Sequence, residues 1–441
     1  MKEKLNVGLL NDSFPPVIDG VANAVLNYAR IIEESYGHAV VATPYYPDAV
    51  DRYPFPVIRY RSVDTTKLVG YRTGYPFSAS AMEQLEAEKL DIIHSHCPIM
   101  STLLARTLRK TVEAPIILTY HTKFDIDIAR DIHPAILQTA AIKMLVKNIE
   151  ACDEVWVVSR GAGENLKSLG YQGDYLVMEN GVDFPRGRVG AEACLEISRA
   201  CHIPAGAFVF LFVGRLMWYK GIRLILDALS RLKKQGRSFV MLFVGDGMDR
   251  REIEEYAEQL GLWQDCVFTG AVRDREKLRA YFCRGDLFLF PSTFDTNGIV
   301  VREAAACGLP SVLIRGSCAA EGVTDGRNGY LIEENAAALA FCLAGRMDDP
   351  AGTRQAGAHA MEEIYLSWEE SVHRAYERYH VVLERCGSDG WAEHESGRDE
   401  VFEVISDSID LLNKVRRANT EIKNKGSSLY DRLWDSWERY R

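Results

Sequence analysis

Short apolar segments alternate with helix-like segments along most of the chain, and this alternation occurs twice. The pattern is typical of a parallel sheet with helices on both faces, because each strand reaches its parallel neighbour through a helix. We therefore predict an α/β protein with two doubly wound domains. The expected strands lie at residues 5–12, 38–44, 57–60, 90–96, 114–121 and 152–159, and then at 208–214, 239–245, 267–270 and 284–292.

The length of the chain supports two domains, since 441 residues exceed the size at which one hydrophobic core keeps growing. The segment 179–190 is rich in glycine and contains a proline, which is typical of a connection. We expect domains at 1–183 and 184–365, a helix at 366–388 and a helical tail at 389–441.

Composition excludes several classes of protein. The apolar runs are shorter than the ~20 residues that span a bilayer, and the first residues lead directly into a strand, so we expect no transmembrane helix or signal peptide. The ten cysteines form no CxxC pair, and those at Cys152, Cys266 and Cys307 have the contexts of buried thiols, which fits a reducing cytoplasm. A net charge of −10 argues against a nucleic-acid partner.

The most informative motif is residues 294–310, FDTNGIVVREAAACGLP, which place Asp295 and Glu303 eight residues apart around Gly298. The preceding expected strand ends just before Asp295, and ligands of α/β sheets bind at the carboxyl ends of strands. The helix that follows offers free amides to an anionic group. Two carboxylates there can accept hydrogen bonds from vicinal hydroxyls of a sugar or ribose. The alternative is a helix whose early acids only offset its dipole.

This motif resembles the E-x7-E signature of glycosyltransferase family 4, the retaining nucleotide-sugar transferases of the GT-B fold, which ends in EAMACGxP. The resemblance implies two Rossmann-like domains facing across a cleft, and a terminal helix that crosses back to brace the first domain. The start of the chain and its YHT element are similar to the branch that glucosylates diacylglycerol-type lipids. The segments that carry the resemblance are 303–310, 213–221, 244–254, 267–272 and 325–333, with 12–22 and 120–122 in the first half.

Two cationic side chains can stabilise the negative charge that develops on the oxygens of a departing nucleoside diphosphate. Arg215 lies just beyond an expected strand and Lys220 near the start of the next helix, so both can point into one crevice. The alternative for such a pair is a solvated surface. The resemblance assigns both residues to catalysis and donor binding, and adds Gly270 and Val272 to the donor site.

The resemblance also implies roles around the signature. Glu303 would bind the ribose hydroxyls and Asp295 the hydroxyls of the sugar. Backbone amides at Asn297, Gly298 and Ile299 would serve the sugar and the phosphate. The chain departs from the family in two places, because Asp replaces the usual Glu at 295 and Asn297 replaces an aromatic or apolar residue.

Further candidates lie in the first half of the chain. His121 follows an expected strand, and its match to the family's TxH position implies contact with the donor sugar near the reacting carbon. The loop at 15–25 matches a glycine-rich family loop near the donor phosphate and the acceptor. This chain has Asp19-Gly20 where many members have Gly-Gly, so we expect Gly20 on the donor side and Asp19, with Tyr71 and Tyr75, on the acceptor side.

We expect neither a metal nor a cofactor, since the nucleotide sugar is itself a substrate. His94 and His96 suggest a metal site, but no second ligand cluster with zinc spacing occurs, and alternating strand residues point to opposite faces. The triplet at residues 125–127, Asp-Ile-Asp, matches a metal motif of a different transferase fold, and helix-start acids are the preferred interpretation.

The expected reaction is transfer of a hexose, glucose from a UDP-sugar, to a hydroxyl with retention of configuration. The first acceptor hypothesis is a diacylglycerol-type lipid at the cytoplasmic face of the membrane. The alternatives are a soluble sugar or glycan acceptor, a nucleotide-sugar epimerase, and a silent nucleotide-binding module. Aromatic residues and arginines at 429–441 fit a membrane surface or a packed helix, and the oligomeric state stays open.

Overall fold

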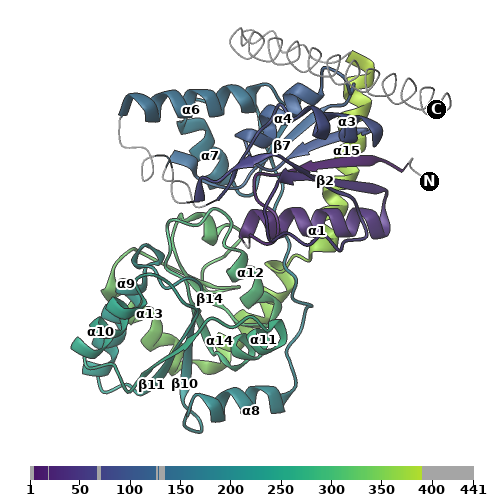
Figure 1. Ribbon diagram of the computed structural model, residues 1–441. Helices are drawn as coiled ribbons and strands as arrows, with labels where there is room; N and C mark the ends of the chain where they lie inside the picture. The colour runs from purple at the N-terminus through teal and green to yellow at the C-terminus, as the bar shows by residue number, and fades with distance from the viewer. Residues whose placement is uncertain (1–3, 18, 67–70, 126–127, 129–134, 390–441) are drawn as a thin grey trace, which may run out of the picture. The chain divides into compact units, whose positions relative to one another are not determined.

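The computed structural model describes residues 4–17, 19–66, 71–125, 128 and 135–389. They form two compact units (Figure 1). The first comprises residues up to 119, residues 125–155 and the described residues from Tyr379 onward, and the second comprises residues 120–124 and 156–378. The domain boundaries predicted after residues 183 and 365 stay predictions.

The first sheet has seven strands in the order β3-β2-β1-β6-β7-β8-β9. Strand β1 pairs in parallel with β2 on one side and with β6 on the other, so that Val7 faces Ala39 and Ile92. A separate antiparallel pair joins β4 (Ser62–Val63) and β5 (Thr73–Gly74). The strands of the sheet are β1 (Asn6–Leu10), β2 (His38–Pro44), β3 (Val57–Tyr60), β6 (Ile92–Ser95), β7 (Ile116–Tyr120), β8 (Glu154–Val157) and β9 (Leu176–Val177).

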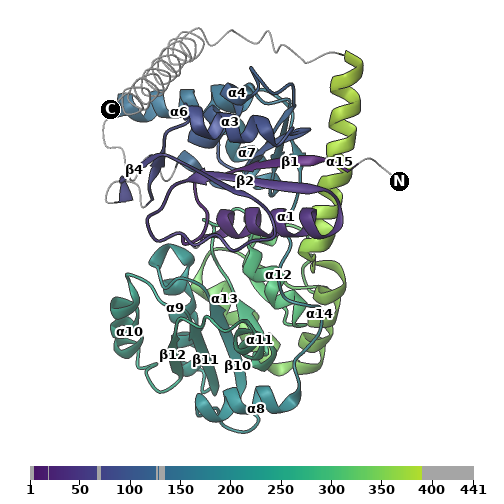
Figure 2. The ribbon, with the colours of Figure 1, turned by 45° about the vertical axis from the view of Figure 1, so that its right-hand side comes forward.

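Helix α1 (Gly20–Ser35) shows why these residues cover the first sheet. Its buried apolar residues recur every three or four positions, which places them on one helix face. This face packs against β1 and β2 (Figure 2). Within the described residues up to 168, the other helices are α3 (Ala79–Ala87), α4 (Met100–Leu108), α6 (Ala135–Glu150) and α7 (Arg160–Ser168).

The second sheet has six strands in the order β12-β11-β10-β13-β14-β15, and all neighbouring strands pair in parallel. From β10 the chain adds β11 and then β12 on one side. It then returns to add β13, β14 and β15 on the other side, which is typical of a doubly wound nucleotide-binding sheet. The strands are β10 (Phe208–Val213), β11 (Phe239–Val244), β12 (Cys266–Gly270), β13 (Leu287–Leu289), β14 (Ser311–Ile314) and β15 (Tyr330–Ile332).

Aromatic residues fill the centre of this second unit. Phe210, Phe212, Phe243 and Phe288 are fully buried on the central strands. Helix α9 buries an apolar stripe that includes Ile222, Ile225 and Leu229. The helices are α8 (Ala191–Ala200), η1 (Trp218–Lys220), α9 (Ile222–Lys234), α10 (Arg250–Gln259), α11 (Arg275–Arg284), α12 (Ile299–Ala306), η2 (Cys318–Ala320), α13 (Ala336–Asp348), α14 (Pro350–Glu363) and α15 (Trp368–Asp389).

The predicted α/β fold is confirmed strand by strand, although the strand expected at 284–292 shortens to β13. The helix predicted at 366–388 is present as α15, and the three thiols predicted to be buried are buried. The tail beyond residue 389 and the last two residues of the Asp-Ile-Asp triplet, 126 and 127, lie outside the described residues. In the part of the chain that the structure describes, no helix is long and apolar enough to cross a bilayer.

The prediction that His94 and His96 point to opposite faces of their strand is wrong. The two residues are two positions apart and therefore share a strand face, and their rings lie 4.1 Å apart. The nitrogens of His94 instead bond to hydroxyl oxygens, Nδ1 to Tyr379 at 2.7 Å and Nε2 to Thr119 at 2.7 Å. His94 thus joins α15 to the core of the first unit.

Candidate active site

The candidate site lies where the second sheet reverses its strand order, between β10 and β13. The connections after these two neighbouring strands lead away from each other, which leaves a crevice at their carboxyl ends. Arg215 and Lys220 follow β10, and residues 295–299 follow β13. The topology therefore brings together two groups of predicted residues that are about 80 positions apart in sequence.

Lys220 and Asp295 form an ion pair in this crevice. The Nζ atom of Lys220 donates a hydrogen bond to Oδ1 of Asp295 at 2.5 Å, and the two side chains are 10% and 22% exposed. The other carboxylate oxygen of Asp295 accepts a hydrogen bond from Oγ of Ser292 at 2.6 Å. Both oxygens of the carboxylate are therefore engaged.

A close backbone contact fixes the position of Lys220. Gly221 follows it with φ of +79°, and a Cβ atom at this position would lie 2.2 Å from the carbonyl oxygen of Pro291. Only glycine fits so near another backbone segment. The ammonium group of Lys220 also lies 5.5 to 5.8 Å from the ring centroids of Tyr219, Phe290 and Phe294.

Arg215 differs from Lys220 in its surroundings. Its side chain is exposed, and within the described residues it makes no hydrogen bond or ion pair. The structure therefore places one cation of the pair beside a carboxylate and leaves the other open to an anionic ligand.

The signature turn is built around Gly298, which has φ of +60° and caps helix α12. A Cβ atom here would lie 2.8 Å from Cβ of Ala319, so both the conformation and the space require glycine. The first two amides of α12, those of Ile299 and Val300, have no acceptor within the helix and can meet an anion. The amide of Val301 donates to the carbonyl oxygen of Gly298 at 2.8 Å. Next to them, Nδ2 of Asn297 is buried and donates no hydrogen bond within the described residues.

Glu303 lies one turn further along α12 and is buried. Burial raises the pKa of its carboxyl, and the guanidinium of Arg275 opposes this rise through a 2.8 Å hydrogen bond to Oε1. The same guanidinium lies 3.6 Å from a carboxylate oxygen of Asp183 and 4.3 Å from the ring centroid of Phe184. Arg275 therefore offsets two negative charges at the position that is expected to bind a ribose.

His121 belongs to the second unit with its neighbours 120–124. Its carbonyl oxygen accepts a hydrogen bond from Oγ1 of Thr296 at 2.7 Å, which attaches it to the signature turn. The hydroxyl of Ser159 donates to the carbonyl oxygen of Thr296. Burial lowers the pKa of His121 from 6.5 to about 3, so its imidazole is neutral at physiological pH.

Gly270 and Val272 lie at the end of β12, at the edge of the second sheet. Gly270 has φ of +77°, and its carbonyl oxygen accepts a hydrogen bond from the amide of Gly245 at 3.0 Å. Val272 is half-buried against the core of the unit. Their roles in donor binding stay predictions.

The first unit holds the remaining candidates, and Asp19 has a local partner. Its carboxylate accepts hydrogen bonds from the amides of Val21 and Ala22, at 2.8 and 2.7 Å, and so caps α1. Two amides of the loop that was expected near the donor phosphate are therefore already engaged. Gly20 begins the helix without a positive φ, and no atom lies within 4 Å of the Cβ that it lacks.

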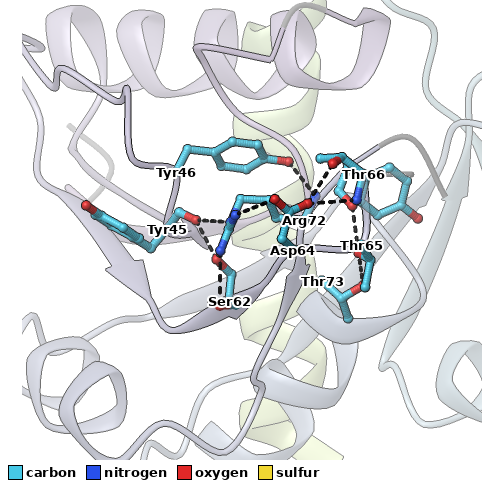
Figure 3. A network of polar contacts seen from close by, with 9 residues as sticks. Tyr45, Tyr46, Ser62, Asp64, Thr65, Thr66, Arg72 and Thr73 are labelled. Atoms are coloured by element: carbon cyan, nitrogen blue, oxygen red, sulfur yellow. Dashed lines mark hydrogen bonds and ion pairs between the residues drawn. The ribbon is translucent and has the colours of Figure 1, made fainter. Parts of the chain in front are cut away.

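Tyr71 and Tyr75 are close in sequence to β5, which contributes to the polar network shown in Figure 3. Arg72 is its centre, with Nε donating to Oγ of Ser62 at 2.9 Å and to the carbonyl oxygen of Tyr45 at 3.1 Å. The carbonyl oxygen of Tyr71 accepts a hydrogen bond from Thr65, whereas the side chain of Tyr75 is 44% exposed. The network holds the segment in place, and the acceptor role of the two tyrosines stays a prediction.

Sequence reasoning missed Arg275, Ser292 and Thr296. A basic residue in the first turn of a helix opposes the helix dipole, and this signal could have drawn attention to Arg275. Ser292 and Thr296 flank Asp295 within the same loop, where hydroxyl groups commonly bond to nearby carboxylates and carbonyls. Their proximity to the motif was the available signal.

The two parallel sheets and the charged switch-point site are those of a glycosyltransferase with the GT-B fold. Among solved structures, Anabaena HepE in complex with UDP has a TM-score of 0.70 at 17% identity, over 86% of this chain and 100% of that one.

Two family models match the chain, "Glycosyltransferase Family 4" at residues 18–186 and "Glycosyl transferases group 1" at residues 196–358. The alpha-monoglucosyldiacylglycerol synthase of Streptococcus pneumoniae is 25% identical over 70% of each chain. The GDP-mannose-dependent alpha-mannosyltransferase of Corynebacterium glutamicum is 27% identical over 75% of this chain and 77% of that protein. The chain belongs to glycosyltransferase family 4 and is a hexosyltransferase.

Proposed function

We propose that the enzyme transfers glucose from UDP-glucose to a hydroxyl of a diacylglycerol-type lipid, with retention of the anomeric configuration. The observation that carries the proposal is the set of opposed charges at the switch point, where Lys220 meets Asp295 and the amides of α12 lead to Glu303. Each of these groups has a matching part in a nucleotide sugar.

Support for the donor comes from chemistry and from relatives. Buried Glu303 can accept hydrogen bonds from both ribose hydroxyls, and Asp295 can accept them from the sugar. HepE was solved with UDP and with UDP-glucose, and the streptococcal relative is named for a glucosyl product. The corynebacterial relative uses GDP-mannose, which makes GDP-mannose the competing donor hypothesis.

In the proposed reaction, charge stabilisation and positioning supply most of the catalysis. Arg215, Lys220 and the first amides of α12 stabilise the negative charge that develops on the leaving diphosphate. His121 remains neutral because of its burial, so it contributes a hydrogen bond near the sugar and does not supply a proton. The leaving phosphate accepts the proton of the acceptor hydroxyl on the same face of the sugar, which retains the configuration.

We infer the acceptor from similarity to the streptococcal alpha-monoglucosyldiacylglycerol synthase. An enzyme with such an acceptor would work at a membrane surface. A soluble sugar or glycan is the alternative acceptor. The two differ in one testable respect, because a lipid acceptor is presented only in vesicles or micelles.

The test is release of nucleoside diphosphate from UDP-, GDP- and ADP-sugars, with and without vesicles that contain diacylglycerol. Release from UDP-glucose that requires the vesicles supports the proposal. Release that needs a soluble sugar refutes the lipid acceptor, and conversion of the donor sugar without any acceptor would identify an epimerase.

A further inference from the structure

We propose that Asp295 is the counter-ion of Lys220 before the donor binds, and that it competes with the donor's diphosphate for this lysine. The carboxylate would thereby weaken the hold of the site on the nucleoside diphosphate that remains after transfer. This inference rests on the proposed function and deepens it, because it assigns Asp295 an effect on product release in addition to sugar binding.

The first support is the fixed geometry of Asp295. One carboxylate oxygen accepts from Lys220 at 2.5 Å and the other from Ser292 at 2.6 Å. Ser292 is fully buried, so its hydroxyl holds the carboxylate in one orientation. A carboxylate that is bound at both oxygens does not turn away from the lysine without losing a hydrogen bond.

The second support is the environment of Lys220. The three nearby aromatic rings attract the ammonium through their faces but provide no strong acceptor for its protons. In the region that the structure describes, Asp295 is the one carboxylate that pairs with Lys220. The close approach of Gly221 to the backbone of Pro291 fixes the position of the neighbouring lysine.

The consequence follows from the charges. An ammonium has three protons, so Lys220 can begin to donate to a phosphate oxygen before it releases Asp295. The negative charge of Asp295 then lies next to a polyanion and repels it, and the side chain is sufficiently buried for water to screen this repulsion only in part. Once the sugar has been transferred, Asp295 replaces the departing phosphate as the partner of Lys220.

The experiment is isothermal titration of UDP, GDP and ADP into the full chain and into Asp295→Asn. Asparagine keeps the size of the side chain and removes the charge. We expect the substitution to tighten binding of the cognate diphosphate about tenfold, equivalent to ~1.4 kcal/mol. Asp295→Glu keeps the charge, and its Kd should stay nearer to that of the unsubstituted chain.

A matched control is Asp265→Asn, which removes the carboxylate from the Lys233 pair, a 2.6 Å contact of the same type in the same unit. It should leave the Kd unchanged. If Asp295→Asn binds the nucleoside diphosphate with an unchanged Kd, the role of Asp295 is limited to sugar recognition. If it binds the diphosphate more weakly, Asp295 is a residue that positions Lys220. Either result overturns the inference.

Ser292→Ala protects the test against misfolding of the first variant. It frees one carboxylate oxygen, so the competition weakens and the diphosphate should bind about threefold more tightly. If the unsubstituted chain binds no nucleoside diphosphate, the proposed function fails and this inference falls with it. If the chain binds one and neither variant tightens it, only the inference fails.

Discussion

From the ion pair between Arg275 and Glu303 we predict how the activity of the enzyme depends on pH. Glu303 is buried, and burial raises the pKa of its carboxyl, whereas Arg275 lowers it through the 2.8 Å hydrogen bond. Asp183 lies near the same guanidinium and raises the pKa of Glu303 further. If the ionised carboxylate binds the ribose, the substitution Arg275→Gln must raise the pH at which donor binding is lost.

The size of the shift can be worked out from the contact. Two unit charges about 4 Å apart interact by ~4 kcal/mol at an effective dielectric constant of 20, equivalent to about three pKa units. Because the side chain of Arg275 is 45% exposed, water screens much of this interaction, and exposed pairs retain ~1 kcal/mol or less. We therefore expect Arg275→Gln to raise the pKa of Glu303 by up to ~0.7 unit.

The assay is kcat/KM for the donor between pH 4.5 and 9. In Arg275→Gln the acid limb should move upward by up to ~0.7 pH unit, while the plateau at high pH changes little. Arg275→Lys should restore most of the shift. Arg237→Gln is the control, since its guanidinium pairs with Asp348 on the exposed surface of the same unit. An acid limb that does not move, or an equal loss at every pH, would refute the reasoning.

Three further predictions concern single residues. Arg215→Ala should lower kcat about 10²-fold, as lost electrostatic donors do, without changing the thermal unfolding midpoint, and near-normal turnover would remove Arg215 from the site. Gly298→Ala should lower the free energy of unfolding by ~2 kcal/mol in urea titrations, because the new Cβ meets Ala319. Gly326 has a similar φ but open space around it, so Gly326→Ala should lower the free energy of unfolding by only ~1 kcal/mol. Equal losses would contradict the steric argument. His121 has a folded pKa of about 3 and an ordinary value of 6.5, so the unfolded chain binds more protons between these values and stability falls as pH drops below about 6.5. Between pH 7.5 and 5.5 the unsubstituted chain should lose ~1 kcal/mol more than His121→Gln in the same titrations, and equal losses would refute the burial effect.

The sequence predicted the strands well because each is a short apolar run between turn residues, and burial on both faces leaves few other solutions. The position of Gly298 was equally predictable, since a glycine before a helix marks a backbone turn. The pairing of Lys220 with Asp295 was not, because the partners lie 75 residues apart and local patterns contain no information about such contacts.

Two site features show different limits of sequence reasoning. The acceptor-side role of Asp19 stays a prediction, but its position directly before a helix is a strong N-cap signal, and its carboxylate does cap α1. Arg275 belongs to a run of charged residues that suggests a solvated helix start. Only the fold shows that its guanidinium reaches buried Glu303.

The contact between His94 and Tyr379 has a consequence for biosynthesis. The two residues lie 285 positions apart and complete the core of the first unit. At about 5 to 20 residues per second, a ribosome that has made residue 155 needs roughly 10 to 50 s more to reach Tyr379. During that time the nascent first unit lacks the hydroxyl that its buried histidine requires, so release of a shortened chain would leave this unit unfinished.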